Sequence, residues 1–154
     1  MQFHFFCSLI WEQHTYKKII MVSEKPIILF DGVCNLCNSA VTFVIKRDPQ
    51  QKFVFASLQS TTGQALLKKF NLSDPNLSSF VFIDNGRVYQ KSTAALMVSK
   101  QLSGIAQLLY GFIIVPAFVR NAVYNFIAKN RYKWFGKKDN CMVPTIQLQS
   151  RFLK

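Results

Sequence analysis

The chain has 154 residues, of which half are hydrophobic and 17% are charged, a balance that supports a packed core and argues against wholesale disorder. Its length suits one domain of ordinary size, and its four cysteines are too sparse for a small secreted disulfide scaffold. Nineteen Lys and Arg stand against seven Asp and Glu, which gives a net charge of +12.

Residues 1–22 differ from the rest of the chain. They lack a basic start, and Glu12 and His14 interrupt them, so their apolar stretches are too short for a signal-peptide core. We expect an N-terminal extension that is disordered or loosely docked, with Met21 as the natural start. The alternative is an apolar helix that docks on the body of the protein or on a membrane.

Strands and helices are predicted to alternate from the first apolar run onwards. Ile27–Phe30 is wholly apolar, as in a buried strand, and apolar residues recur at near-helical spacing from Cys37 to Ile45. Phe53–Ala56 is predicted to form a second strand. Thr61–Phe70 is predicted to form a second helix, capped by Thr61 or Thr62. Because a helix joins the first two strands, they should be parallel.

A hairpin and a third helix follow. The turn sequence Asp84–Asn85–Gly86 separates the strands Phe80–Ile83 and Arg87–Tyr89, and Ser92 or Thr93 is predicted to cap a helix that ends near Leu102. The order β-α-β-α-β-β-α is that of a thioredoxin-like core. The sequence therefore predicts an α/β fold with this core over residues 23–102 and additional C-terminal helices.

Residues 103–154 are predicted to form a helical cover packed on the same domain. Gln101 to Val119 carries no charge, but polar residues, glycines and Pro116 dilute it, so we favour two helical pieces over a membrane span. The second piece should turn one apolar face to the core, comprising Phe118, Val119, Ala122, Val123, Phe126 and Ile127. From position 120 onwards the chain has eight basic residues and one acidic residue, so an anionic partner or a membrane surface could bind there.

Cys34 and Cys37 form a CxxC pair between the first strand and the first helix. Unpaired amides and the macrodipole at a helix start favour an anion, so Cys34 should form a thiolate readily. We predict that Cys34 attacks a substrate disulfide and that Cys37 resolves the mixed disulfide. The alternatives are two buried packing thiols, or a zinc site, which would need Cys141 and a fourth ligand.

Asp31 lies three residues before Cys34. It could cap the turn by accepting backbone amides, or it could exchange a proton with Cys37 if the turn buries it. Both roles are compatible with each other.

The sequence "FDGVCNLCNSAVTFVIKRD" resembles the DCC family of thiol-disulfide oxidoreductases, whose Asp-Cys-Cys signature falls on Asp31, Cys34 and Cys37. The likeness continues through "FASLQS", "KSTAAL" and "RYKWFGKKDNCMVP". It implies a thioredoxin-like fold and disulfide exchange. In such folds a cis-proline precedes the hairpin, whereas here Leu77, Ser78 and Ser79 take that place and should line the groove in a trans conformation.

The resemblance and the neighbouring residues suggest further candidates. The substrate groove is expected to include Gly32 and Val33 beside the cysteines, and Ser92 and Thr93 as a helix start that could hold the carboxylate of glutathione. Cys141, between lysines and a proline, could be a third redox thiol or a packing cysteine.

These observations lead to one prediction and one alternative. We predict a cytoplasmic enzyme that exchanges disulfides with a protein or small-molecule substrate, with no cofactor, no metal and no specific nucleic-acid partner. The alternative is a non-catalytic binding module on the same fold, attached to a protein partner or a membrane surface.

Overall fold

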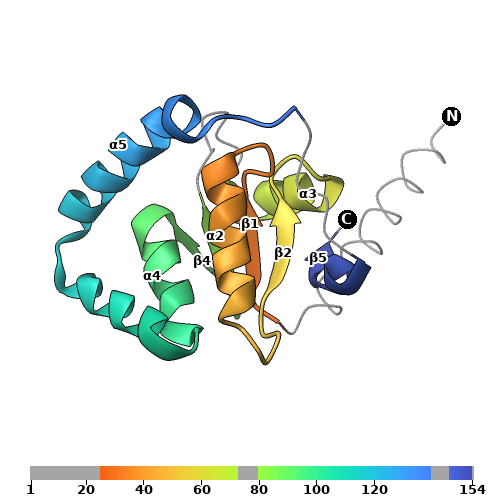
Figure 1. The fold of residues 1–154 in the computed structure, drawn as a ribbon, viewed down its shortest axis with the longest axis horizontal. Coiled ribbons are helices and arrows are strands. Elements are labelled where there is room, and N and C mark those ends of the chain that lie inside the picture. The colour runs from red at the N-terminus through yellow and green to blue at the C-terminus, as the bar shows by residue number, and fades with distance from the viewer. Residues whose placement is uncertain (1–24, 73–79, 140–145, 154) are drawn as a thin grey trace, which may run out of the picture.

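The computed structural model describes residues 25–72, 80–139 and 146–153 and has a mixed α/β fold (Figure 1). Predictions for the N-terminal extension, for Leu77–Ser79 and for Cys141 lie outside these residues. In chain order the elements are β1 (Ile27–Phe30), α2 (Asn35–Lys46), β2 (Val54–Ser57), α3 (Thr61–Lys69), β3 (Val81–Asp84), β4 (Arg87–Gln90), α4 (Lys91–Gln101), the 3₁₀ helix η1 (Gly104–Ile114), α5 (Ala117–Phe135), the 3₁₀ helix η2 (Ile146–Arg151) and β5 (Phe152–Leu153).

The five described strands form one mixed sheet in the order β4-β3-β1-β2-β5. β1 and β2 are parallel and β3 and β4 form an antiparallel hairpin, so both predicted pairings are confirmed. β5, which the sequence did not indicate, adds a parallel strand beside β2. The arrangement is compatible with a thioredoxin-like fold.

Alternate side chains of the sheet enter two separate cores. Ile28 and Phe30 of β1 pack with α2 and α4 on one face, and Ile27 and Leu29 pack with α3 on the other. β1 is therefore buried on both sides, which explains why its sequence is apolar without interruption. The central strand ends at the junction that carries the two cysteines.

Two predicted helix caps were wrong. Ser60, not Thr61 or Thr62, caps α3, because its Oγ accepts the amide of Gly63. α4 begins at Lys91 directly after β4, with no side-chain cap at Gln90, so Ser92 and Thr93 lie inside the helix. The short connection between β4 and α4 leaves no room for a cap at these later positions.

The predicted apolar inner face of α5 was also wrong. Its apolar side chains are exposed, with Phe118 at 76% and Phe126 at 61%. The half-buried or buried positions instead include Asn121, Tyr124 and Arg131, which recur at helical spacing and bond to polar groups of the core edge. The helix thus turns its polar residues inward.

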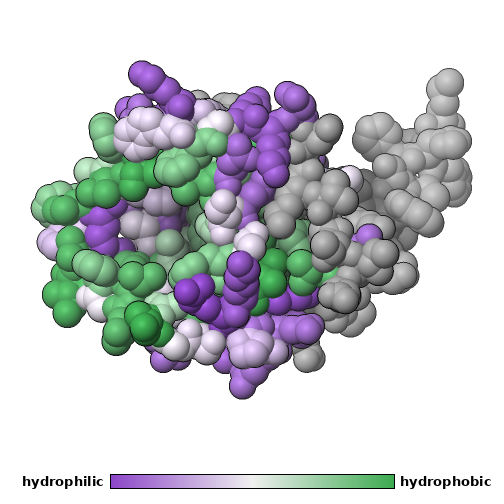
Figure 2. Space-filling model, in the orientation of Figure 1, coloured by the Kyte–Doolittle hydropathy of each residue, from purple (hydrophilic) through white to green (hydrophobic). Residues whose placement is uncertain are grey.

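Hydrophobic residues gather over η1 and α5, along one side of the molecule (Figure 2). Ile105 of η1 is 83% exposed and Ile114 is 88% exposed. Within the described ranges, no helix combines the length and the hydrophobicity that crossing a membrane would require.

Candidate active site

Cys34 is the N-cap residue of α2 and connects β1 to that helix. Its backbone is extended, and the amide of Cys37 donates a hydrogen bond to the Cys34 Sγ at 3.4 Å. A sulfur at this position receives an amide that has no partner within the helix, and it lies at the positive end of the helix dipole. Cys34 thus occupies the helix-start position that the sequence predicts.

The two sulfurs differ in access. The Cys34 residue has no exposed surface, whereas Cys37 is half-buried and lines a cleft. The predicted first attack by Cys34 requires a substrate to reach its sulfur, and in this conformation the substrate would meet Cys37 first.

The residues after α5 lie against the backbone around Cys34. Cys34 and Lys137 form an isolated antiparallel bridge, and the Lys138 amide donates to the Val33 carbonyl at 2.8 Å. Asn35 Nδ2 donates to the Phe135 carbonyl, also at 2.8 Å. The segment Gly136–Lys138 therefore joins the end of α5 to the cysteine turn.

The pKa of Cys37 is raised to about 12. Burial is the largest cause, followed by the hydrogen bond with Cys34 and by the negative charge of a Cys34 thiolate. Asp31 also raises this pKa, while the positive charge of Arg131 lowers it. Cys37 is therefore held as a thiol at neutral pH.

Alkylation should report this dependence of Cys37 on Cys34. In the reduced protein at about pH 10, Cys37 stays protonated, since its pKa lies above that of an ordinary thiol, and iodoacetamide should modify it slowly. Cys34→Ala removes the hydrogen bond and the charge, so Cys37 should react several-fold faster, with an apparent pKa that falls but stays above 9. Site-resolved mass spectrometry measures both rates. An unchanged rate would show that burial alone sets this pKa.

Asp31 is 2% exposed and lies at the centre of a polar network. Its Oδ1 accepts the amide of Val33 at 3.2 Å and Nε2 of Gln59 at 2.9 Å. Its Oδ2 accepts a guanidinium nitrogen of Arg131 at 2.7 Å and the hydroxyl of Tyr132. The carboxylate is thus charge-paired and fully hydrogen-bonded in the interior.

The network assigns Asp31 the turn-capping contact that the sequence suggested. It also includes Arg131 and Tyr132, whose roles could not be predicted from the sequence, although both stand in the stretch "RYKWF" that resembles the DCC family. Burial and the hydrogen bond to Asp31 raise the pKa of Tyr132. Burial acts to lower the pKa of Arg131, but the hydrogen bond with Tyr132 and the negative charges nearby outweigh burial, so the pKa is raised overall.

The groove candidates have partners within the chain. Gly32 donates its amide to Gln59 and accepts Nδ2 of Asn38, and both backbone groups of Val33 are bonded as described above. Ser92 and Thr93 face α5 rather than the cysteines: Ser92 donates to Asn121 at 2.6 Å, and Arg120 donates to both hydroxyls.

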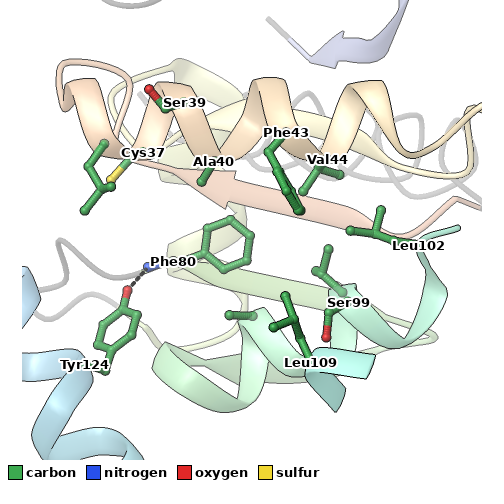
Figure 3. Close-up of a pocket in the computed structure, with 13 residues that line it drawn as sticks. Cys37, Ser39, Ala40, Phe43, Val44, Phe80, Ser99, Leu102, Leu109 and Tyr124 are labelled. Carbon is green, nitrogen blue, oxygen red and sulfur yellow. Dashed lines mark hydrogen bonds between the residues drawn. The ribbon is translucent and has the colours of Figure 1, made fainter. Parts of the chain in front are cut away.

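A cleft of about 440 Å³ runs between α2 and α4 (Figure 3). Cys37 lies at one end of it, opposite Tyr124, whose hydroxyl accepts the amide of Phe80 at 2.9 Å. Leu102 and Leu109 lie toward the other end. The cleft could not be predicted from the sequence, because its lining comes from α2, α4, η1 and α5 and from Phe80 and Leu102 between the elements.

Comparisons with known proteins support a redox role. Residues 28–137 match the family model described as DCC1-like thiol-disulfide oxidoreductase. The chain is 58% identical over 136 residues to the uncharacterized protein YuxK of Bacillus subtilis (strain 168), which covers 86% of this chain and 99% of that protein. It is 38% identical over 135 residues to the DCC family protein At1g52590, chloroplastic, of Arabidopsis thaliana, covering 87% and 78% respectively. No solved structure gives a significant match.

Proposed function

Because the chain belongs to the DCC1-like thiol-disulfide oxidoreductase family, we propose that it exchanges disulfides through Cys34 and Cys37 on a thioredoxin-like fold. The observation that carries this proposal is that the two sulfurs at the start of α2 have different environments. Cys34 accepts an amide of the helix start, and Cys37 is kept protonated beside it. A single CxxC pair is typical of intracellular redox proteins, so the cytoplasm is the expected compartment.

Reduction of a substrate disulfide proceeds in two steps. The Cys34 thiolate attacks one substrate sulfur, the substrate S–S bond breaks, and a mixed disulfide forms while the other substrate sulfur leaves as a thiolate. The leaving thiolate takes the proton of Cys37, and the resulting Cys37 thiolate attacks Cys34 Sγ. The second substrate sulfur then leaves as a thiolate and takes a proton from water. Two electrons pass to the substrate, and the protein is left with a Cys34–Cys37 disulfide.

The first step itself prepares Cys37 for the second. Once Cys34 is bonded to the substrate, its sulfur carries no negative charge. It then no longer accepts a strong hydrogen bond from the Cys37 thiol. Two of the causes that raise the pKa of Cys37 are then removed, so this pKa falls and the resolving thiolate forms more readily. The order of the two attacks follows from the charge on Cys34.

Access to Cys34 requires a local movement. We propose that Gly136–Lys138 shifts away from the cysteine turn before the attack, which breaks the Lys138–Val33 and Asn35–Phe135 hydrogen bonds. Asp31 acts in this scheme as a positioning residue, since it holds the turn through Val33 and the end of α5 through Arg131.

The proposal is tested on the reduced full-length protein in a single turnover. Mixing with bis(2-hydroxyethyl) disulfide should produce a Cys34–Cys37 disulfide, identified by peptide mapping, at a rate above that of free cysteine at the same pH. If oxidation is no faster than for free cysteine, or joins other cysteines, the activity is refuted. The alternative of a non-catalytic binding module, which the exposed apolar residues of η1 and α5 favour, would then replace it.

A further inference from the structure

The exchange chemistry explains the two sulfurs but not the shape of the cleft beside them. The cleft extends from Cys37 along α2 and α4 to Leu102 and Leu109, well beyond the reacting end (Figure 3). A site that served only to admit a disulfide bond would need no such extension. Its volume of about 440 Å³ lies within the range of small-molecule sites, about 300–1,000 Å³.

The lining of the cleft is almost wholly apolar. Among the residues that the structure describes, none that lines it carries a charged side chain. The polar side chains there are the thiol of Cys37 and the hydroxyls of Ser39, Ser99 and Tyr124, of which Ser99 donates to the Leu96 carbonyl. A carboxylate or ammonium group placed in this lining would lose its hydration without gaining a partner of opposite charge.

We propose that the cleft binds a neutral small-molecule disulfide with an aliphatic chain. The disulfide lies against Cys37, and the chain runs between α2 and α4 toward Leu102. This inference rests on the proposed function, and it adds the substrate class. It also disfavours glutathione disulfide, whose four carboxylates and two amino groups would have to stay outside.

A small molecule fits this lining better than a polypeptide does. An extended peptide brings an amide and a carbonyl with every residue, and each needs a hydrogen-bond partner when it leaves water. The Phe80 amide is already bonded to Tyr124, and the side chains of the other described lining residues are hydrocarbon apart from the groups named above. An aliphatic chain makes no such demand and gains free energy from burial.

With such a substrate the exchange needs no reactant other than a proton from water. The Cys34 thiolate opens the cyclic disulfide of a 1,2-dithiolane, for example, forming a mixed disulfide and one free substrate thiolate. Cys37 protonates that thiolate and then attacks Cys34 Sγ. The second substrate sulfur leaves as a thiolate and takes a proton from water, which gives the dithiol. Cys37 lines the cleft and is hydrogen-bonded to Cys34, so the disulfide is held against Cys37 and reaches Cys34 Sγ once Gly136–Lys138 has moved as proposed above.

Two dithiolanes that share the reacting ring test the cleft. Lipoamide carries an aliphatic chain, whereas 1,2-dithiolane-4-carboxamide lacks it, and both are neutral. In single turnovers with reduced protein, the second-order rate constant should be at least about tenfold higher for lipoamide, because only its chain can enter the cleft. Lipoate, which ends in a carboxylate, should react more slowly than lipoamide.

Substitutions at exposed alanines supply the structural control. Ala95 of α4 and Ala40 of α2 line the cleft and are exposed, so Ala95→Trp and Ala40→Trp should narrow it with little effect on folding. Each should bring the ratio of the two rate constants close to one. Ala117→Trp places the same side chain on an exposed alanine outside the lining and should keep the ratio.

The outcomes separate the two proposals. Equal rates for both dithiolanes, or a preference that survives Ala95→Trp and Ala40→Trp in folded protein, would overturn the cleft assignment and leave the exchange activity intact. If the protein reduced neither of the dithiolanes nor bis(2-hydroxyethyl) disulfide, the exchange activity itself would be refuted. A stronger preference for a cysteine-containing peptide disulfide than for lipoamide would assign the cleft to a polypeptide and contradict the inference.

Discussion

Replacing Arg131 with Met should lower the free energy of unfolding by about 3–5 kcal/mol, the usual result when one partner of a buried ion pair is removed. Arg131 and Asp31 are both 2% exposed, and their side chains approach to 2.7 Å. Met fills much of the vacated space, so the loss comes from the carboxylate that stays buried without its cation. Urea denaturation followed by circular dichroism measures it.

Two further variants show whether charge is the cause. Arg131→Met combined with Asp31→Asn removes both charges and should recover a substantial part of the lost stability. Arg151→Met breaks the second buried pair, with Asp48, and should destabilise the fold similarly. In folded protein Arg131→Met should slow alkylation of Cys37 and Arg151→Met should not, because the positive charge of Arg131 lowers the pKa of that thiol. Equal stability of Arg131→Met and the wild type would contradict the role given to this pair.

Replacing Cys34 with Ser should reduce the rate of exchange on the order of 10³-fold, since no other group supplies the attacking thiolate. Cys37→Ser should allow the first attack and then stop, so one substrate fragment stays bonded to each protein molecule. Stopped-flow measurement of the released substrate thiol, together with the mass of the intact protein, distinguishes the two variants.

The exposure of the sulfurs makes this comparison decisive. Cys7→Ser makes the same chemical change elsewhere in the chain and should leave the rate unchanged. If Cys34→Ser accumulated a mixed disulfide at Cys37 while Cys37→Ser did not react, then Cys37, the sulfur in the cleft, would be the attacking residue. The roles of the two cysteines would be reversed, and the buried Cys34 would be the resolving one.

The elements close to the cysteines could be predicted because their signals are local. The uninterrupted apolar run of β1, the turn Asp84–Gly86 and the proline before α5 each act within a few residues. The position of Cys34 at a helix start follows from the same kind of signal. The predicted mixed α/β architecture is therefore confirmed at this level.

The rest depends on contacts between distant parts of the chain. Apolar and polar residues are interspersed along α5, and a prediction based on hydrophobicity alone places the apolar side against the core. The opposite holds because Asp31, the Phe80 amide and Ser92 offer polar partners at the edge of the core. Pattern alone does not show which groups lie opposite a helix, so Arg131 and the cleft could not be foreseen.

The pairing of Arg131 with Asp31 spans 100 positions of the chain. During synthesis the strand and helix that carry the cysteines are completed long before the arginine that neutralises the aspartate beside them. Until α5 has emerged and docked, the half-made domain holds an uncompensated carboxylate and two uncovered thiols. We therefore expect the cysteines of the nascent chain to be open to oxidation and mispairing until its last third has left the ribosome.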